Sequence, residues 1–178
     1  VSEGSHEVKI PLSQAPDFVR VDPGAALPKS MKFKRPREMM IAQLTGDPDP
    51  MGRIDAAHSL VEGADRAGVE ALIRAFRSEK FWGVQAEIAE SLGKIASPAA
   101  LDALLSALQA AEHPKARVAV VRALGKFKDP RALAALQPIA HSDPSYFVEA
   151  AALRATARLS VLNDPLSDGW VKAFEGKL

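Results

Sequence analysis

The chain has 178 residues, of which 47% are hydrophobic and 25% are charged, and its formal net charge is +1. This composition excludes a wholly disordered chain, and no uninterrupted apolar run approaches the roughly 18 residues of a membrane span. Cysteine is absent, so disulfides and thiolate metal sites are excluded as well. The near-neutral charge gives no general reason to expect nucleic acid or a membrane as a partner. Abundant alanine and few aromatic residues favour closely packed helices.

The first 35 residues differ from the rest of the chain. Three short stretches alternate roughly between apolar and polar residues, as strands do, and prolines separate them: 6–10, 17–21 and 31–34. We expect residues 1–35 to be the last strands of a β-sandwich domain whose remainder is missing; the alternative is a strap that lies on the following helices. The chain also begins at Val1 without the features of a signal peptide, so we expect a fragment of a cytoplasmic protein.

From Pro36 onward, apolar residues recur with a period of 32 residues. One column of this repeat holds Leu60, Leu92 and Leu124, another holds Met40, Leu72, Leu104 and Leu136, and small residues recur at Ser59, Ser91, Ala123 and Ala155. A fixed period in this range is typical of stacked supersecondary units. We therefore predict a mainly α fold, an α-solenoid of about four helical hairpins over residues 36–163, preceded by the short β segment.

Each hairpin is expected to contain two amphipathic helices, and neighbouring hairpins must stack because neither helix covers its own apolar stripe. Pro98 and Pro130 are predicted at helix starts, after Ser97 and Asp129 as N-caps. The second helices are predicted over residues 51–63, 83–96, 115–127 and 146–162. The last stretch, 164–178, carries Trp170, Val171 and Phe174 and is predicted to be a helix that caps the end of the stack.

The chain contains no sequence motif for catalysis or for metal binding. The dipeptide His6-Glu7 has no second histidine at position 10, so the helical zinc motif fails. The residues His141, Ser142 and Asp143 are consecutive, which is the wrong geometry for a catalytic triad. Glycine-rich phosphate-binding motifs are also missing. We therefore predict no catalytic residue, no metal ligand and no cofactor in this chain.

The second helices carry a ridge of polar residues. One column reads His58, Glu90, Arg122 and Arg154, and the column four residues later reads Glu62, Lys94, Lys126 and Arg158. Positions i and i+4 share a helix face, and second helices usually line the concave, ligand-binding side of a solenoid. With two arginines from a polar column near the turns, the candidate concave-face contacts are Arg53, Arg117, Arg122, Lys126, Arg154 and Arg158. The alternative is a solvated face held by pairs such as Glu90 with Lys94.

The repeat unit resembles HEAT or HEAT-like repeats. The resemblance is carried by Asp-Pro pairs near the turns, by second helices rich in Val and Ala, and by Leu-Gly-Lys before the next hairpin, as in Leu92-Gly93-Lys94 and Leu124-Gly125-Lys126. It covers residues 36 to 162 and implies the same stacked-hairpin fold as the period.

A second resemblance crosses the junction between the N-terminal stretches and the repeats. Its residues are Phe18-Val19-Arg20-Val21-Asp22-Pro23-Gly24, Met31-Lys32-Phe33, Arg37-Glu38 through Gln43-Leu44, Gly52-Arg53-Ile54-Asp55-Ala56-Ala57 and Phe81-Trp82-Gly83-Val84-Gln85-Ala86-Glu87. They are similar to bacterial members of the zinc aminopeptidase family that includes aminopeptidase N. The family's zinc-binding His-Glu-x-x-His has no counterpart here, so no functional residue is carried over. The resemblance implies the non-catalytic C-terminal end of such an enzyme.

The leading hypothesis is that the chain forms a helical wall over the catalytic cleft of a zinc aminopeptidase. Its partners would be the catalytic and β-sandwich domains of the parent protein, with peptide substrate as a further contact. Zinc would lie in the missing catalytic domain, and neither nucleic acid nor a membrane is expected. The alternative is a stand-alone HEAT-repeat scaffold for protein–protein interaction, whose basic ridge binds an acidic partner. A HEAT-type lyase that acts on a tetrapyrrole has no supporting residue.

Overall fold

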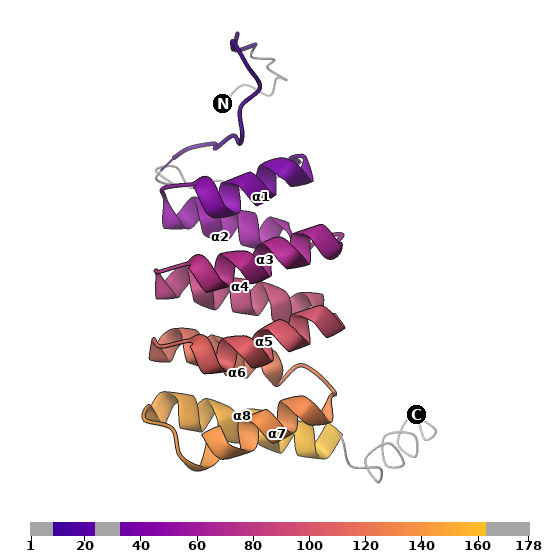
Figure 1. Cartoon of the computed structure of the whole chain (residues 1–178), viewed down its shortest axis with the longest axis vertical. Helices are drawn as coiled ribbons and strands as arrows, with labels where there is room; N and C mark the ends of the chain where they lie inside the picture. The colour runs from indigo at the N-terminus through magenta and orange to yellow at the C-terminus, as the bar shows by residue number, and fades with distance from the viewer. Residues whose placement is uncertain (1–8, 24–32, 163–178) are drawn as a thin grey trace, which may run out of the picture.

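The computed structural model describes residues 9–23 and 33–162 of the chain. Within these ranges the chain forms eight helices, which stack as four hairpins (Figure 1). The helices are α1 (Arg37–Gly46), α2 (Pro50–Ser59), α3 (Arg66–Ser78), α4 (Trp82–Ile95), α5 (Pro98–Ala110), α6 (Pro114–Leu124), α7 (Pro130–His141) and α8 (Tyr146–Leu162). The predicted mainly α solenoid of four hairpins is confirmed.

Side-chain caps and prolines begin several of the helices. Ser97 accepts a hydrogen bond from the amide of Ala100 at the start of α5, and Asp129 accepts one from the amide of Arg131 at the start of α7. Proline follows each of these caps directly, where its missing N–H leaves no helical hydrogen bond unmade. Because these signals are local, the helix starts could be predicted without knowledge of the packing.

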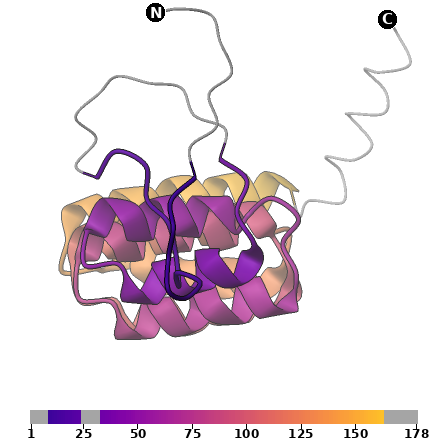
Figure 2. The same cartoon turned by 90° about the horizontal axis from the view of Figure 1, so that it is seen from above.

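The apolar core is continuous from hairpin to hairpin. In Figures 1 and 2 the first helices (α1, α3, α5, α7) form one layer and the second helices (α2, α4, α6, α8) form another. The largest fully buried side chains include six from the predicted columns, namely Leu60, Leu92 and Leu124 from the second-helix column and Leu72, Leu104 and Leu136 from the first-helix column. Each hairpin therefore completes its core only by contact with its neighbours.

Successive second helices approach each other closely at two glycines. A Cβ atom on Gly93 would lie 2.8 Å from the Cβ of Ala123, and a Cβ on Gly125 would lie 2.9 Å from the Cβ of Ala155. Both distances are shorter than van der Waals contact, so a larger residue would push the helices apart. The second helices contact one another more extensively than the first helices do, which makes their layer the inner side of the stack.

The N-terminal segment corrects one prediction, because residues 17–21 form no strand and no strand occurs elsewhere in the described ranges. Residues 16–23 instead lie against hairpin 1 as a strap, the alternative to the β segment, while residues 9–15 are exposed and extend away from the stack (Figure 1). Phe18 lies beside Gly46 at the end of α1, and Arg20 pairs with Asp47 at 3.2 Å. The strap is extended but forms no β-sheet, because it packs on helices and has no partner strand within the described residues. The predicted strands 6–10 and 31–34 lie largely outside those residues.

Arg35, just before α1, attaches the chain to the second helix of the same hairpin. Its Nη2 donates a hydrogen bond to Ser59 Oγ at 2.7 Å and pairs with Asp55 Oδ2 at 2.8 Å. Its guanidinium also lies 5.2 Å from the centre of the Phe33 ring, a cation–π contact. Ser59, which the repeat placed among the small residues between helices, is therefore held by the segment that enters hairpin 1.

The last hairpin departs from the repeat in its pattern of burial. Leu153 follows Ala57, Ala89 and Val121 in one column, yet it is 53% exposed while the other three are buried. Its side chain lies on the face of α8 where a further hairpin would stack, and the described residues contain no such hairpin. The predicted capping helix over 164–178 lies outside the described residues.

Candidate functional site

Four of the six predicted contact residues line one hollow on the inner side of the stack. Its volume is about 250 Å³, and we call it the cationic hollow; it is lined by Arg122, Gly125, Lys126, Ala151, Arg154, Ala155 and Arg158. The small residues form its apolar part, and the approach of Gly125 to Ala155 sets the two helices side by side. Arg122 of α6, Lys126 just after α6, and Arg154 and Arg158 of α8 all line this one opening.

The four cations of the hollow form no ion pair within residues 9–23 and 33–162, although Glu90 lies near enough for the charge of Lys126 to lower its pKa. All four residues are exposed, and none of their side chains forms an ion pair or a hydrogen bond with another residue of those ranges. Like charges that share one depression repel each other, and their summed field attracts anions. Guanidinium groups bind carboxylates and phosphates through paired hydrogen bonds, so the hollow is suited to an anionic group.

The charges of the inner face are sorted along the stack. The equivalent positions of hairpins 1 and 2, on α2, just after it and on α4, carry mostly acidic residues, namely Asp55, Glu62, Glu87 and Glu90, with Lys94 and His58 among them. The equivalent positions of α6 and α8 carry Arg122, Lys126, Arg154 and Arg158. The inner face is therefore mainly acidic over hairpins 1 and 2 and basic over hairpins 3 and 4.

Two acidic residues of hairpins 1 and 2 have partners on the same face. His58 Nε2 lies 2.8 Å from Glu87 Oε2, and Lys94 Nζ lies 3.2 Å from Glu90 Oε1. The hydrogen bond from Lys94 is the main reason that the pKa of Glu90 lies below its ordinary value, and the charge of Lys126 lowers this pKa further. The predicted pair of Glu90 with Lys94 is thus present, and the alternative of a solvated, paired face describes hairpins 1 and 2 but not the cationic hollow.

The other two predicted contact residues have a structural role. Arg53 pairs with Glu79 at 2.7 Å and donates to the carbonyl of Asp47 at 2.9 Å. Arg117 pairs with Asp143 and donates to the carbonyl of Leu108. Each arginine thus reaches from the second helix of one hairpin to the turn of the next one, and neither lines the cationic hollow.

The acidic residues that bind these arginines were missed as a group by sequence reasoning. Asp47, Glu79 and Asp143 all occupy the same position of the 32-residue repeat, inside the turn between the two helices of a hairpin. Asp47 is bound by Arg20 of the strap, in the way that Arg53 binds Glu79. The shared register of the three acids was the signal that could have identified them.

Aromatic residues gather at the edge where the second helices begin. The Trp82 ring stacks on His113 with 5.0 Å between ring centres, and Lys115 Nζ lies 4.5 Å above the Trp82 ring. Tyr146 and Phe147 at the start of α8 are 78% and 77% exposed, and their rings lie edge to face. The turns of hairpins 2 and 3 therefore cover each other's aromatic groups, whereas the ring pair of hairpin 4 is open to solvent.

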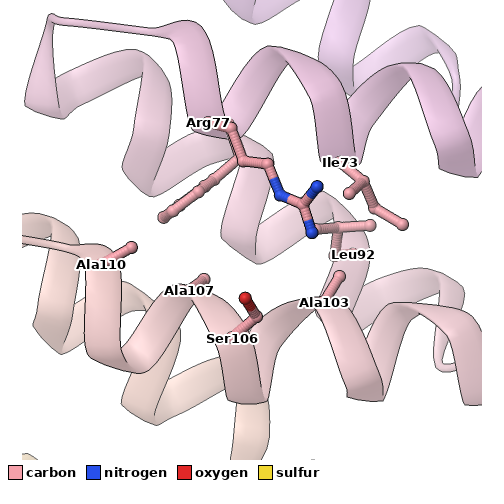
Figure 3. A pocket seen from close by; sticks show the side chains of 8 residues that line it. Ile73, Arg77, Leu92, Ala103, Ser106, Ala107 and Ala110 are labelled. Carbon is pink, nitrogen blue, oxygen red and sulfur yellow. The ribbon is translucent and has the colours of Figure 1, made fainter.

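A second hollow of about 250 Å³ lies on the outer side, between α3 and α5 (Figure 3). Its wall is mainly apolar, and Arg77 of α3 extends across it toward the α5 side, where Ser106 and Ala107 lie. The first helices contact each other less than the second helices do, which leaves room for a gap on this side. With a single charged group, this hollow is the weaker candidate for a binding site.

No group of three or more His, Cys, Asp or Glu side chains within the described residues is arranged to hold a metal ion. No helix among them is long and apolar enough to cross a membrane.

A family model described as HEAT repeats matches residues 37–114 and 77–157. The chain belongs to the HEAT-repeat family. Among solved structures, human deoxyhypusine hydroxylase in complex with glycerol is similar over 71% of the chain, with 25% identity and a TM-score of 0.64. The match covers 44% of the hydroxylase, so the chain spans less than half the length of that protein.

The complex of CpcE and CpcF of phycocyanin lyase from Nostoc is similar over 80% of this chain and 71% of the matched one, with 22% identity and a TM-score of 0.54. At that identity the likeness shows the fold alone. None of the curated protein sequences matches the chain.

These findings overturn the aminopeptidase hypothesis. The family match is to HEAT repeats, and the similar structures are a hydroxylase and a lyase complex, so the resemblance to aminopeptidase N was wrong. The proposed wall over a peptidase cleft and the partner domains of a parent enzyme are wrong for the same reason. The zinc ion expected in a separate catalytic domain depended on this resemblance and loses its support.

Proposed function

We propose that the chain is a HEAT-repeat scaffold for protein–protein interaction, and that the cationic hollow between α6 and α8 binds an acidic segment of a partner protein. The observation that carries the proposal is the set of four cations around one hollow, none of which forms an ion pair with another described residue. Carboxylates of a partner would remove the mutual repulsion of these cations. One of the similar structures is itself a complex of two proteins, which agrees with a binding role for the fold.

The sorting of charge favours an acidic peptide over a nucleic acid. A nucleic acid carries one negative charge per nucleotide, and it therefore binds best along a continuous row of basic side chains. Beyond the cationic hollow, Lys94 is already paired with Glu90 and the neighbouring positions carry Glu87 and Glu62, so the basic track does not continue along the inner face. A peptide can place a few carboxylates in the hollow and remain uncharged elsewhere.

The proposal is tested with a fluorescein-labelled peptide of alternating Glu and Ser residues, by fluorescence anisotropy in about 50 mM salt, where screening is weak. We expect the double variant Arg122→Glu/Arg154→Glu to bind the peptide at least about tenfold more weakly than the wild type. The matched control is Arg74→Glu/Lys80→Glu, which makes the same change of net charge at exposed cations of hairpin 2 and should retain binding.

Equal loss of binding in both double variants would mean that only net charge matters, and it would contradict a site at the cationic hollow. Tighter binding of a single-stranded oligothymidylate than of the peptide would contradict the choice of partner. Melting curves followed by circular dichroism establish that both variants are folded.

A further inference from the structure

The cationic hollow is continuous with an exposed aromatic residue on the same face of α8. Phe147, Ala151, Arg154 and Arg158 are separated by four, three and four residues, so they follow one face of the helix. Ala151 and the two arginines line the hollow, which places Phe147 one helical turn beyond its edge. A ligand that lies along this face of α8 meets the phenylalanine ring and the cations in succession.

Phe147 differs from the aromatic residue at the same edge of hairpin 2. Trp82 there is covered by His113 and Lys115 from the next turn, and it is half-buried. Phe147 lies 32 residues after Lys115, and it is 77% exposed beside Tyr146, which is 78% exposed. Two adjacent aromatic rings that are both open to solvent form an exposed apolar patch, which often marks an interaction site. Aromatic side chains also contribute strongly to the binding energy of interfaces.

We infer that the partner segment is bipartite, with acidic residues in the cationic hollow and an apolar or aromatic side chain on Phe147; this inference rests on the proposed function. The geometry also defines the spacing of the two parts. Phe147 precedes Arg154 by seven residues, which is about 10 Å along a helix at 1.5 Å per residue. An extended peptide covers this length in about three residues. The partner motif is therefore an apolar or aromatic residue about three positions from a short acidic run.

The ring and the cations have different roles in this arrangement. The cations attract acidic segments in general, and their effect is weakened by salt. Contact with the Phe147 ring removes apolar surface from water, and it therefore selects among acidic segments and persists at higher salt. The two contributions can be measured separately.

The experiment uses two peptides that differ in one residue. The first is the labelled Glu/Ser peptide, and the second carries a tryptophan about three residues from the acidic run. We expect the tryptophan peptide to bind the wild type about fivefold more tightly than the parent peptide, as a stacked aromatic pair provides. Phe147→Ala should remove this gain and leave the affinity for the parent peptide unchanged. The matched control, Phe81→Ala, alters an exposed aromatic residue of hairpin 2 and should keep the gain.

Equal affinities of the wild type for the two peptides would overturn the bipartite motif, and so would a gain that persists in Phe147→Ala. Both results leave the proposed function intact, provided that the parent peptide binds and that Arg122→Glu/Arg154→Glu abolishes this binding. A wild-type chain that binds neither peptide overturns the proposed function together with the motif. A peptide of the same composition, with its tryptophan about eight residues from the acidic run, should bind like the parent peptide.

Discussion

Leu124 and Leu153 are the same residue type in neighbouring second helices, but their surroundings differ. Leu124 is fully buried against the adjacent hairpins, whereas Leu153 is 53% exposed. We expect Leu124→Ala to lower the free energy of unfolding by about 2–5 kcal/mol, because it removes transfer energy and leaves a cavity. Leu153→Ala should change it by less than about 0.5 kcal/mol, as surface substitutions do. Urea unfolding of the two variants measures the difference, and equal destabilisation would contradict the register of the stack.

Gly93 and Gly68 provide a second residue-level prediction with an internal control. A Cβ on Gly93 meets the Cβ of Ala123 at 2.8 Å and its Cα at 3.1 Å, and neither atom can move without the α6 backbone. A Cβ on Gly68 meets Arg37 Nη1 at 2.8 Å, the end of a flexible side chain. We expect Gly93→Ala to destabilise the fold by about 1–3 kcal/mol, despite the higher helix propensity of alanine. Gly68→Ala should be close to neutral in the same thermal unfolding measurement.

At the scale of the helices, the 32-residue period predicted the buried columns because every inner hairpin has the same two neighbours. The period alone would place Leu153 in the core with Ala57, Ala89 and Val121. Leu153 is exposed because burial depends on the next hairpin as well as on the helix face. The period also placed Arg53 and Arg117 among the contact residues, although both bind the turn of the following hairpin. A polar column in a sequence shows which side chains recur. It does not show that each of these arginines meets an acidic residue 26 positions later in the chain, because that depends on how the hairpins pack.

The link between Arg53 and Glu79 makes stability depend on pH. Burial raises the pKa of the Glu79 carboxyl, but the hydrogen bonds from Arg53 and from the Phe81 amide lower it by more, so the pKa lies below its ordinary value. A lowered pKa in the folded state adds stability above the ordinary value, about 4.3, and this stability is lost as the pH falls through the folded-state pKa. At neutral pH, Glu79→Gln should therefore be less stable than the wild type by about 1–3 kcal/mol.

This difference should shrink as the pH falls from 7 toward 3, because protonation of the carboxyl removes the charge that Arg53 binds. Urea unfolding at pH 7 and near pH 3 measures it, with Glu112→Gln, an exposed turn glutamate, as the control that should behave like the wild type at both values. A Glu79→Gln deficit that is the same at both pH values would show that the carboxylate charge has no part in the link between hairpins.

For the molecule as a whole, the strap acts as an additional unit at the start of the solenoid. Arg20 binds Asp47 as Arg53 binds Glu79, so hairpin 1 receives from the strap the kind of ion pair that hairpins 2 and 4 receive from the hairpin before them. The strand alternation that suggested a β-sandwich is also the pattern of an extended segment with one side on a helical surface. The two cases differ only in whether the segment packs on a second sheet or on helices, and the local sequence does not contain that information.

The strap leads to a prediction about where the solenoid opens. In a repeat fold each hairpin is stabilised by its nearest neighbours, so loss of a terminal contact should open the terminal hairpin first. In Arg20→Ala, the buried carboxylate of Asp47 keeps the hydrogen bonds from Gln43 and from the Asp49 amide but loses its cation. We expect amide hydrogen exchange in α1 and α2 to become roughly ten- to a hundredfold faster, which corresponds to about 1.5–3 kcal/mol for a charged hydrogen bond.

Exchange in α5 and α6 should remain unchanged, because these helices lie two hairpins away from the strap. Arg66→Ala is the matched control, since Arg66 forms only an exposed pair with Glu70 within one helix and its loss should leave every helix unaffected. Acceleration spread evenly over all four hairpins would mean that the stack opens as one cooperative unit. Unchanged exchange in α1 and α2 would mean that the strap lies on hairpin 1 without stabilising it.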